Sequence, residues 1–530
     1  MYKLLKIFKT SQAFPFLAWG VFPFIMLNFH MPKILLTTLN SRYTHTSIAL
    51  RYLYANLKEF QKDTKILEFS INDAIQTIAE KLLINEPEII GIGVYIWNVS
   101  FVKELIHIIK KVSPKTTIVL GGPEVTHEPF RVKFDDADFI IQGEGDLAFY
   151  QLCKKIFDKT PPKEKIIKMS MPTLKELKLP YKYYTDADIK NRYIYVEASR
   201  GCPFECEFCL SSMDERVRAF NIDELLKEFE ILWQRGARNF KFIDRTFNLN
   251  IKTASKLLDF FLEKEPPYFA HFEVVPDHFP ASLKEKIARF GHGALQLEIG
   301  IQTLNPEIAN NISRNLNLQK IQQNISFLEN ETQAHIHLDL IVGLPGESLE
   351  SFGKNLDKLV SLSSCEIQIG ILKKLSGTHI NRHDIKHGMV YSDIPPYDIL
   401  KNNQLSFNDI QIMKRFARFW DLTYNSGNFK NTAPLIWKDE SVFENFYAFG
   451  MWVYNKTDST YKISLQRLAE LIFTYLKEVK KLQEEFIAQH MLKDIMKLKG
   501  RAIPPYLKKY AKNFTINAKD GTSGFNKRQL

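Results

Sequence analysis

The sequence predicts an α/β protein with two parallel sheets in series, followed by a helical region. Three observations predict this fold class. Short apolar runs alternate with amphipathic helical patterns twice along the chain, which indicates parallel strands joined by right-handed crossovers. Glycine-rich turns follow two runs of the first series, and a loop with three cysteines opens the second. At 530 residues the chain is long enough for more than one core.

The first series predicts five strands with helices between them. The strands are expected at residues 33–37, 65–70, 89–95, 117–120 and 139–142. Such a series indicates a doubly wound, flavodoxin-like sheet, whose ligands bind outside the carboxyl ends of the strands. Glycines at those ends let a ligand approach the backbone closely. The candidate binding residues at these ends are Asn40, Trp97, Gly121, Gly122, Gly143, Glu144 and Gly145.

Cys202, Cys206 and Cys209 share one short loop after the apolar run 193–199. Three thiolates on such a loop can hold three irons of a four-iron cluster and leave the fourth iron without a protein ligand. Zinc is the alternative, but structural zinc takes four ligands, and no Cys or His follows at the usual spacing of a second pair. The other two cysteines, Cys153 and Cys365, each lie alone in an apolar stretch and are expected in the core.

Five further strands are expected after the cysteine loop, at residues 239–243, 270–275, 295–301, 335–342 and 366–372. The helix before the first of them has Asn221 as its N-cap and ends at Gly236. Functional groups in parallel α/β barrels gather at the carboxyl ends of strands. The candidates there are Asp244, Glu298, Gln302, Gly343 and Gly346. An Asx turn for Asp244, a satisfied barrel residue for Glu298 and plain turns for the glycines are the structural alternatives.

The spacing C-x3-C-x2-C, with Phe208 before the last cysteine, resembles the signature of the radical S-adenosylmethionine (radical SAM) enzymes. The resemblance implies a partial (β/α)6 TIM-type barrel, a 4Fe-4S cluster, and reductive cleavage of S-adenosylmethionine (SAM) to a 5′-deoxyadenosyl radical. It also implies an external electron donor such as flavodoxin or ferredoxin. The implied SAM contacts are Phe208, Gly343 and Gly346 near the adenine, Asp244 at the methionine amino group, and Glu298 and Gln302 at the ribose or substrate.

The runs Gly121-Gly122-Pro123 and Gly143-Glu144-Gly145, placed before the cysteines, resemble the cobalamin (B12)-binding domain of one radical SAM subfamily. The resemblance covers roughly residues 32–395 and implies cobalamin and, by analogy, methyl transfer to an unactivated carbon. The motif D-x-H-x-x-G, which supplies a cobalt ligand in B12 mutases, is absent from the first series. His45 and His127 remain alternative ligands, although lone loop histidines are more often solvated or hydrogen-bonded.

Two other functions stay open: a cobalamin-independent radical SAM enzyme and a non-enzymatic iron-sulfur protein. The sequence identifies neither the substrate, expected to be a small molecule, nor a catalytic residue. An iron-sulfur cluster needs a reducing compartment, so we expect the protein in the cytosol.

The expected division of the chain has six parts. These are an apolar extension (1–30), the cobalamin-binding domain (31–160), a linker (161–190), the radical SAM domain (191–395), a helical domain (396–490) and a basic tail (491–530). The extension is interpreted as an upstream start before Met31, with a membrane anchor as the alternative. The net charge of +11 is concentrated at the two chain ends. The tail is expected to be a solvated helix and frayed end, with RNA or membrane contact as the alternative.

Overall fold

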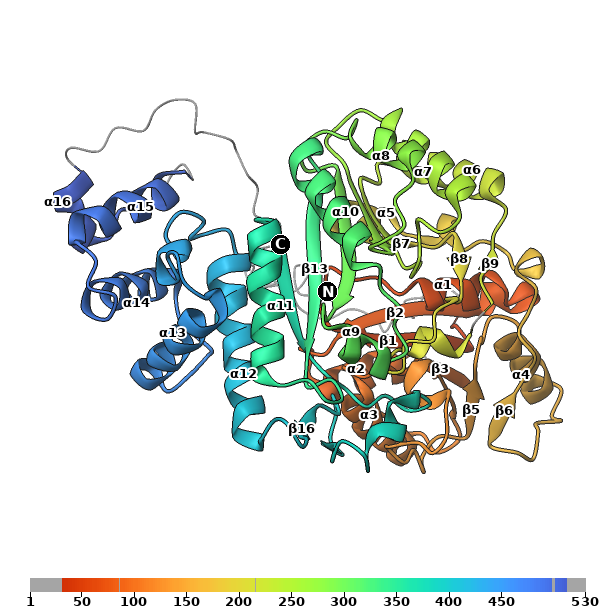
Figure 1. Cartoon of the computed structure of the whole chain (residues 1–530). Coiled ribbons are helices and arrows are strands. Elements are labelled where there is room, and N and C mark those ends of the chain that lie inside the picture. Colours follow the sequence, from red (N-terminus) through yellow and green to blue (C-terminus); the bar gives the residue numbers. More distant parts are fainter. Residues whose placement is uncertain (1–30, 85, 215, 498–500, 512–530) are drawn as a thin grey trace, which may run out of the picture.

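Two six-stranded parallel sheets and a helical region follow one another along the chain (Figure 1). The computed structural model describes residues 31–84, 86–214, 216–497 and 501–511. This order confirms the predicted fold class. The expectations for residues 1–30 and for the last part of the basic tail lie outside the described residues. Within the described ranges, no helix combines the length and apolar character that crossing a bilayer requires.

The first sheet has the strand order β2-β1-β3-β4-β5-β6. Its strands are β1 (Ile34–Asn40), β2 (Thr64–Ser70), β3 (Ile89–Gly93), β4 (Thr117–Gly121), β5 (Phe139–Gln142) and β6 (Ile166–Lys168). Its helices are α1 (Ile48–Ala55), α2 (Ile75–Leu83), α3 (Val99–Val112) and α4 (Ala148–Phe157). Separate apolar clusters lie on the two faces, one with α2 and α3 and the other with α1 and α4. Every residue of β1 is therefore buried, as in a sheet covered on both sides.

The sixth strand corrects the prediction of five strands. β6 pairs with β5 through Ile140 and Ile166, and it lies inside the segment 161–190 that was expected to be a linker. The strand has only three residues and follows two prolines and a run of charged residues, so it leaves no apolar pattern in the sequence. The rest of the segment leads through α5 (Asp186–Asn191) to the second sheet.

The second sheet has the order β14-β13-β12-β11-β10-β7, and each neighbouring pair is parallel. Its strands are β7 (Ile194–Val196), β10 (Asn239–Phe242), β11 (Phe269–Val274), β12 (Leu295–Gln302), β13 (His335–Val342) and β14 (Glu366–Ile371). The helices that alternate with them are α6 (Ile222–Gln234), α7 (Ile251–Leu262), α8 (Ala281–Ile287), α9 (Pro306–Asn311), α10 (Leu318–Glu331) and α11 (Leu349–Leu362). β7 and β14 stand at opposite ends of this order, so the barrel is open, as predicted.

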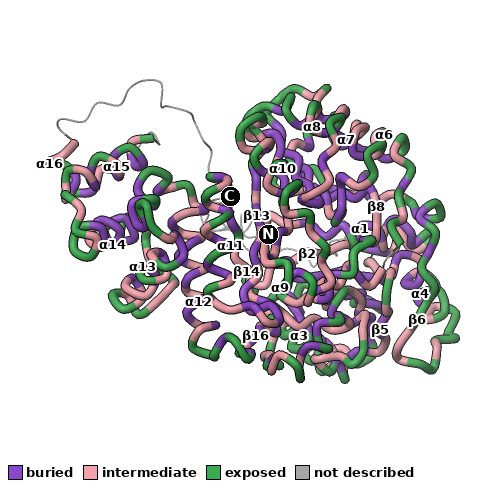
Figure 2. The backbone as a smooth tube through the Cα atoms, viewed as in Figure 1, coloured by how far each residue is buried: buried purple, intermediate pink, exposed green. Residues whose placement is uncertain are grey.

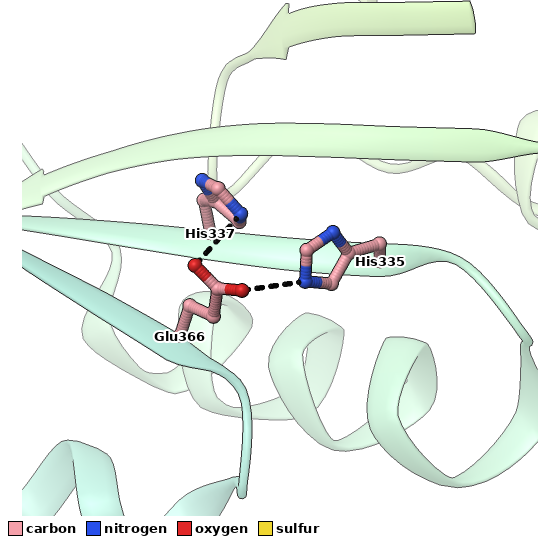
Figure 3. A group of neighbouring side chains, drawn as sticks. All are labelled: His335, His337 and Glu366. Carbon is pink, nitrogen blue, oxygen red and sulfur yellow. Dashed lines mark hydrogen bonds and ion pairs between the residues drawn. The ribbon is translucent and has the colours of Figure 1, made fainter. Parts of the chain in front are cut away.

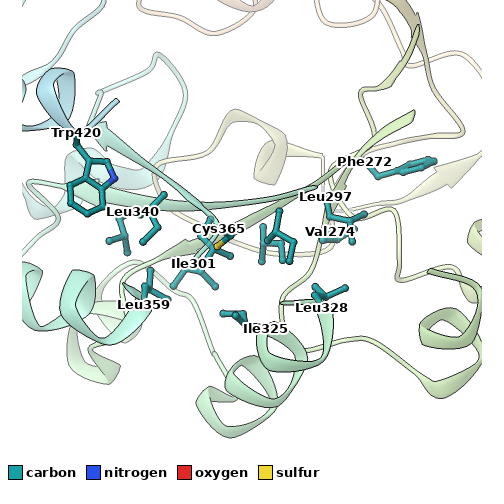
Figure 4. Close-up of a cluster of buried hydrophobic side chains, with 14 of the residues drawn as sticks. Phe272, Val274, Leu297, Ile301, Ile325, Leu328, Leu340, Leu359, Cys365 and Trp420 are labelled. Carbon is teal, nitrogen blue, oxygen red and sulfur yellow. The ribbon is translucent and has the colours of Figure 1, made fainter. Parts of the chain in front are cut away.

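Buried and half-buried residues alternate strictly along β12. The buried positions carry Leu297 and Ile301, which pack against the helices outside the barrel (Figure 4). Cys365 belongs to the same apolar cluster and Cys153 to the core of the first sheet, which confirms both as core residues. The half-buried positions of β12 and β13 alternate with these core positions, so they lie on the inner face of the barrel, and they are largely polar.

The helical region comprises α12 (Phe407–Trp420), α13 (Val442–Thr457), α14 (Leu465–Glu478), α15 (Glu484–Met496) and α16 (Lys508–Ala511). The hairpin of β15 (Val390–Tyr391) and β16 (Ile399–Lys401) spans the expected boundary at residue 395. The boundary at residue 490 falls inside α15, where Met491 is fully buried. Buried stretches along these helices mark a packed unit (Figure 2).

The described part of the basic tail packs onto the helical region. The Tyr506 ring lies 5.2 Å from that of Phe473, and the Tyr510 hydroxyl donates to Glu484 at 2.5 Å. Residues 501–511 therefore fold back onto the helices and are not a frayed end.

Candidate active site

A short antiparallel pair closes the base of the cysteine loop. Its strands are β8 (Ser199–Arg200) and β9 (Arg218–Ala219). Gly201, between β8 and the first cysteine, has φ +90°, and a Cβ there would collide with the Arg216 carbonyl. The Cys202 N–H donates to the Asp214 carbonyl at 2.9 Å. The backbone thus presents the three thiols from one constrained turn.

The thiols fit a multi-iron cluster better than a single ion. Cys202 and Cys206 are buried and Cys209 is half-buried. Burial, followed by the neighbouring thiols, raises the pKa of Cys202. Among the described residues, no cysteine belongs to a group of three ligands whose atoms all lie within 4.8 Å. One zinc ion, with Zn–S bonds of about 2.3 Å, would draw three sulfurs closer together.

Arg314 approaches the loop from the segment after α9. Its Nη1 donates to Cys206 Sγ at 3.3 Å, and its Nη2 donates to the Gly300 carbonyl. A cavity of about 610 Å³ reaches Arg314 from the side of Asp277 and the residues between Leu304 and Leu318. Hydrogen bonds to cluster sulfurs are one of the ways a protein sets a cluster's reduction potential. The sequence carried no signal for Arg314, which lies more than a hundred residues beyond Cys206.

Glu207, between Cys206 and Cys209, anchors the loop to two distant segments. Its buried carboxylate accepts from the Ser313 hydroxyl at 2.7 Å, lies 2.7 Å from His383 Nε2 and pairs with Arg382. The Glu207 carbonyl also accepts from the Ile380 N–H at 2.9 Å. Sequence reasoning missed this residue, although a carboxylate between two cluster cysteines was a usable signal.

Asp244 lies at the carboxyl end of β10, directly behind the cysteine loop. Its carboxylate accepts from the Ala198 N–H at 2.9 Å and from the Ser199 hydroxyl at 2.6 Å. Burial raises its pKa to about 6, although these hydrogen bonds oppose the shift. Asp244 therefore holds the strand end that leads to Cys202 and does not form an Asx turn. Its contact with a methionine amino group stays a prediction.

Glu298 and Gln302 lie on the inner side of β12. Glu298 Oε2 is 2.9 Å from His271 Nε2; burial opposes ionisation, but His271 lowers the pKa of Glu298 to about 2. The carboxylate is therefore ionised and held by its neighbour. Gln302 has φ +68° at an irregular register, which turns the chain where the strand ends.

Gly343 and Gly346 occupy a turn with φ +92° and +86°. A Cβ on Gly343 would lie 2.7 Å from the Ile399 side chain, and one on Gly346 would lie 3.2 Å from Asn311. Backbone conformation and packing are thus sufficient reasons for glycine here. Phe208 is partly buried against the main core. SAM contacts by these three residues remain predictions.

A cavity of about 320 Å³ lies at the carboxyl ends of β3, β4 and β5. All five glycine-run candidates line it: Gly121, Gly122, Gly143, Glu144 and Gly145. A Cβ on Gly143 would meet no atom within 4 Å, and one on Gly121 would meet only the Ile141 carbonyl at 3.9 Å. Because the glycines keep this wall open at the backbone, the residues present fit a broad cofactor approaching the strand ends.

The barrel contributes Glu197, Arg200 and Ile243 to the same cavity. Arg200 pairs with Glu144 at 3.0 Å, Asp146 at 2.9 Å and Glu197 at 2.9 Å. Burial opposes the charge of Arg200, but Glu197 and Asp146 outweigh it and raise the pKa of the guanidinium. Glu144 also pairs with Arg218. Arg200 lies two residues before Cys202, so the cavity adjoins the cysteine loop. Sequence reasoning did not assign Arg200 or Glu197.

Four other sequence candidates do not line this cavity. The Asn40 amide donates to Glu68 at 2.7 Å, and the Trp97 ring N–H donates to the Leu39 carbonyl at 3.0 Å. The His45 ring lies 2.5 Å from the Tyr195 hydroxyl, and His127 packs against Gly377. All four have partners within the protein.

Family comparisons agree with this architecture. Residues 34–153 match the profile of the B12 binding domain, and residues 196–359 match that of the radical SAM superfamily. The chain is a radical SAM enzyme with a cobalamin-binding domain. Its cofactors are a 4Fe-4S cluster, SAM and cobalamin. Residues 385–524 match a protein family of unknown function, DUF4080.

Relatives of this radical SAM enzyme include methyltransferases. An uncharacterized methyltransferase of Pyrococcus horikoshii is 25% identical over 415 residues, 70% of this chain and 86% of the relative. The 2-(S-pantetheinyl)-carbapenam-3-carboxylate methyltransferase of Streptantibioticus cattleyicolor is 24% identical over 334 residues, 56% of this chain and 47% of its own.

Two solved structures share the fold. The cobalamin-dependent SAM radical enzyme OxsB, with aqua-cobalamin and SAM bound, gives a TM-score of 0.59 at 14% identity, over 94% of this chain and 83% of its own. The radical SAM methyltransferase TsrM from Kitasatospora setae, with cobalamin and a [4Fe-4S] cluster bound, gives a TM-score of 0.53 at 16% identity. The match covers 66% of this chain and 77% of TsrM.

Proposed function

We propose that this enzyme transfers a methyl group to an unactivated carbon of a small-molecule substrate. The observation that carries the proposal is the cavity at the glycine-rich strand ends, which Arg200 shares with the cysteine loop. Cofactors at these two places would meet at the mouth of the barrel. The methyltransferase names of two relatives support the same reaction class.

The cofactors carry the reaction, and the chain holds and shields them. When bound, the cluster and SAM would supply the radical chemistry that activates a substrate C–H bond, and cobalamin would supply the methyl group. Cys202, Cys206 and Cys209 hold the cluster, while Asp244 and Glu207 fix the two sides of their loop. Arg200 and Glu144 fix the wall between the cofactors.

The substrate is proposed to bind against the polar inner face of the barrel. Asp339 on β13 stands out there, because no described residue hydrogen-bonds its buried Oδ1. Burial and the nearby Glu298 and Glu273 carboxylates raise the pKa of Asp339 well above its ordinary value. Asp339 therefore keeps its proton to a higher pH than a free aspartate, and when protonated it can donate a hydrogen bond to a substrate acceptor.

The first test is the metal content of anaerobically purified protein reconstituted with iron, sulfide and hydroxocobalamin. We expect about four iron and one cobalt per chain. Iron without cobalt would favour the cobalamin-independent alternative.

The second test adds SAM labelled with CD3, a reductant and fractionated small metabolites. We expect 5′-deoxyadenosine together with a CD3-labelled product, and reduced flavodoxin or ferredoxin is the proposed donor. Deoxyadenosine without transferred label would indicate another radical reaction. A stable cluster that never cleaves SAM would favour the non-enzymatic alternative.

A further inference from the structure

Two histidines and a glutamate meet at the amino ends of the last two barrel strands (Figure 3). His335 and His337 lie two residues apart on β13, so both side chains lie on the same face of the sheet. Glu366 begins β14 and pairs in register with His337. The strands are parallel, so this group lies at the end of the barrel opposite the cysteine loop, and the proposed methyl transfer does not use it.

The three side chains converge on one small volume. Glu366 Oε1 lies 3.1 Å from His335 Nε2, and Glu366 Oε2 lies 3.2 Å from His337 Nε2. The two imidazole rings stand nearly perpendicular, with centroids 4.7 Å apart. One ligand atom from each residue lies within 4.8 Å of the other two. Among the described residues, no other three His, Cys, Asp or Glu side chains bring their ligand atoms as close together as a single metal ion requires.

The surroundings suit a metal ion with one open side. The His337 and Glu366 side chains are 12% and 15% exposed, whereas that of His335 is 47% exposed. The half-buried His337 and Glu366 supply fixed ligands, and the exposed His335 leaves a path for an ion and its water. Gln296 lies beside the His337 ring, with Nε2 3.4 Å from both ring nitrogens, and limits the ring's movement.

We propose that His335, His337 and Glu366 bind one divalent first-row cation, with zinc as the reference ion. Two imidazole nitrogens and a carboxylate oxygen form a donor set common to zinc and iron(II) sites. Three protein ligands leave a coordination position for water. Since β14 is the edge strand of an open barrel, the ion would join that edge to β13.

The test is zinc binding to the full chain with its cluster already assembled, so that the cluster cysteines do not compete. Zinc content is measured after equilibrium dialysis for the wild type, His335→Ala and Glu366→Gln. We expect one more zinc per chain in the wild type than in either variant. Equal zinc content in all three proteins would overturn the proposal.

A matched control separates metal binding from loss of an ion pair. His107 pairs with Asp136 at 2.9 Å on the first domain, so His107→Ala also removes a histidine-carboxylate contact. We expect this variant to keep the zinc of the wild type.

Thermal unfolding gives a second readout, because an ion that binds only the folded state raises its stability. Zinc should raise the unfolding temperature of the wild type and of His107→Ala, but not that of His335→Ala. A rise of the same size in all three proteins would also contradict the site.

Discussion

The two parallel sheets use the same elements but expose different surfaces. In the first, helices cover both faces, and every residue of β1 is buried. In the second, helices cover one face only, and β12 alternates buried and half-buried residues. A sheet covered on both faces can offer a ligand only the ends of its strands, whereas an open barrel offers a whole inner face. The chain thus places a cavity at the strand ends of one sheet and a polar surface inside the other.

The first prediction separates the two sheets most strongly. Cys206→Ala removes a cluster ligand, so iron should fall from about four per chain to near zero, while bound cobalt stays unchanged. Iron and cobalt analysis of the reconstituted protein measures both. Cys365→Ala is the control, because this buried cysteine lies in the core and should keep the iron. Full iron content in Cys206→Ala would remove this residue from the ligand set.

Arg200 connects the two sheets, so its loss should affect both. Arg200→Met leaves Asp146 and Glu197 without their shared cation and leaves Glu144 with Arg218 alone, and it should destabilise the fold by about 3 kcal/mol at pH 7. Burial raises the pKa of Glu197 and Arg200 opposes that rise. Without Arg200, protonation of Glu197 should therefore relieve the repulsion, and the loss of stability should shrink as pH falls towards 5. Urea unfolding at both pH values measures it. A loss independent of pH would contradict this account.

A larger side chain in the cavity of the first sheet should weaken cobalamin binding without affecting the iron-sulfur cluster of the second. Gly121→Leu places a side chain into open space and should weaken cobalamin binding at least about tenfold, since each 1.4 kcal/mol of lost binding energy is a factor of ten. Titration with hydroxocobalamin measures the affinity, and iron content should not change. Gly291→Leu is the control, because a Cβ on Gly291 meets no atom within 4 Å and Gly291 does not line the cavity. Unchanged affinity in Gly121→Leu would place cobalamin elsewhere.

The turn after β13 should make stability depend on pH. Burial raises the pKa of Glu347 to about 8 from 4.5, although Thr303 and Asn355 donate hydrogen bonds to its carboxylate. Between these pH values the folded state holds a proton that the unfolded state lacks, so stability falls as pH rises. The free energy of unfolding of Glu347→Gln should therefore exceed that of the wild type by a few kcal/mol at pH 8.5, and the two should be equal near pH 5. Urea midpoints test this, with exposed Glu350→Gln as the control.

The smallest effect concerns the cluster's surroundings. Arg314→Gln removes a positive donor from Cys206 and should lower the cluster's reduction potential while iron stays at about four per chain. A redox titration followed by electron paramagnetic resonance measures the potential. Arg238→Gln, which contacts Trp233 and the neighbouring backbone, should leave it unchanged. Equal potentials in the wild type and Arg314→Gln would exclude this role.

The sequence predicted elements that carry a local pattern. All six barrel strands were found, because apolar runs mark them and helical patterns separate them. Five match to within one residue at each end, whereas β7 ends three residues before the predicted end at residue 199. β6 was not predicted, because a strand of three residues is too short to show a periodic pattern. Its pairing with β5 depends on the assembled sheet. The cysteine triad and the two glycine runs were found for the same local reason.

Contacts between distant segments were not predictable from the sequence. Glu207 contacts Ser313 and His383, which lie 106 and 176 residues away in the sequence, and no local spacing predicts these contacts. Asn40 and Trp97 were placed correctly near strand ends, but their side chains bind the backbone and Glu68 and do not line the cavity. Position at a strand end therefore did not determine where the side chain points.

The Arg200 contacts limit how these domains can be exchanged between proteins. Arg200 belongs to the radical SAM domain, while Glu144 and Asp146 belong to the preceding cobalamin-binding domain. A chimera that takes its cobalamin domain from a relative without both carboxylates would leave Arg200 beside Glu197 alone. A transplanted domain must therefore bring its acidic residues with its glycines, and the two domains of this chain have to change together as they evolve.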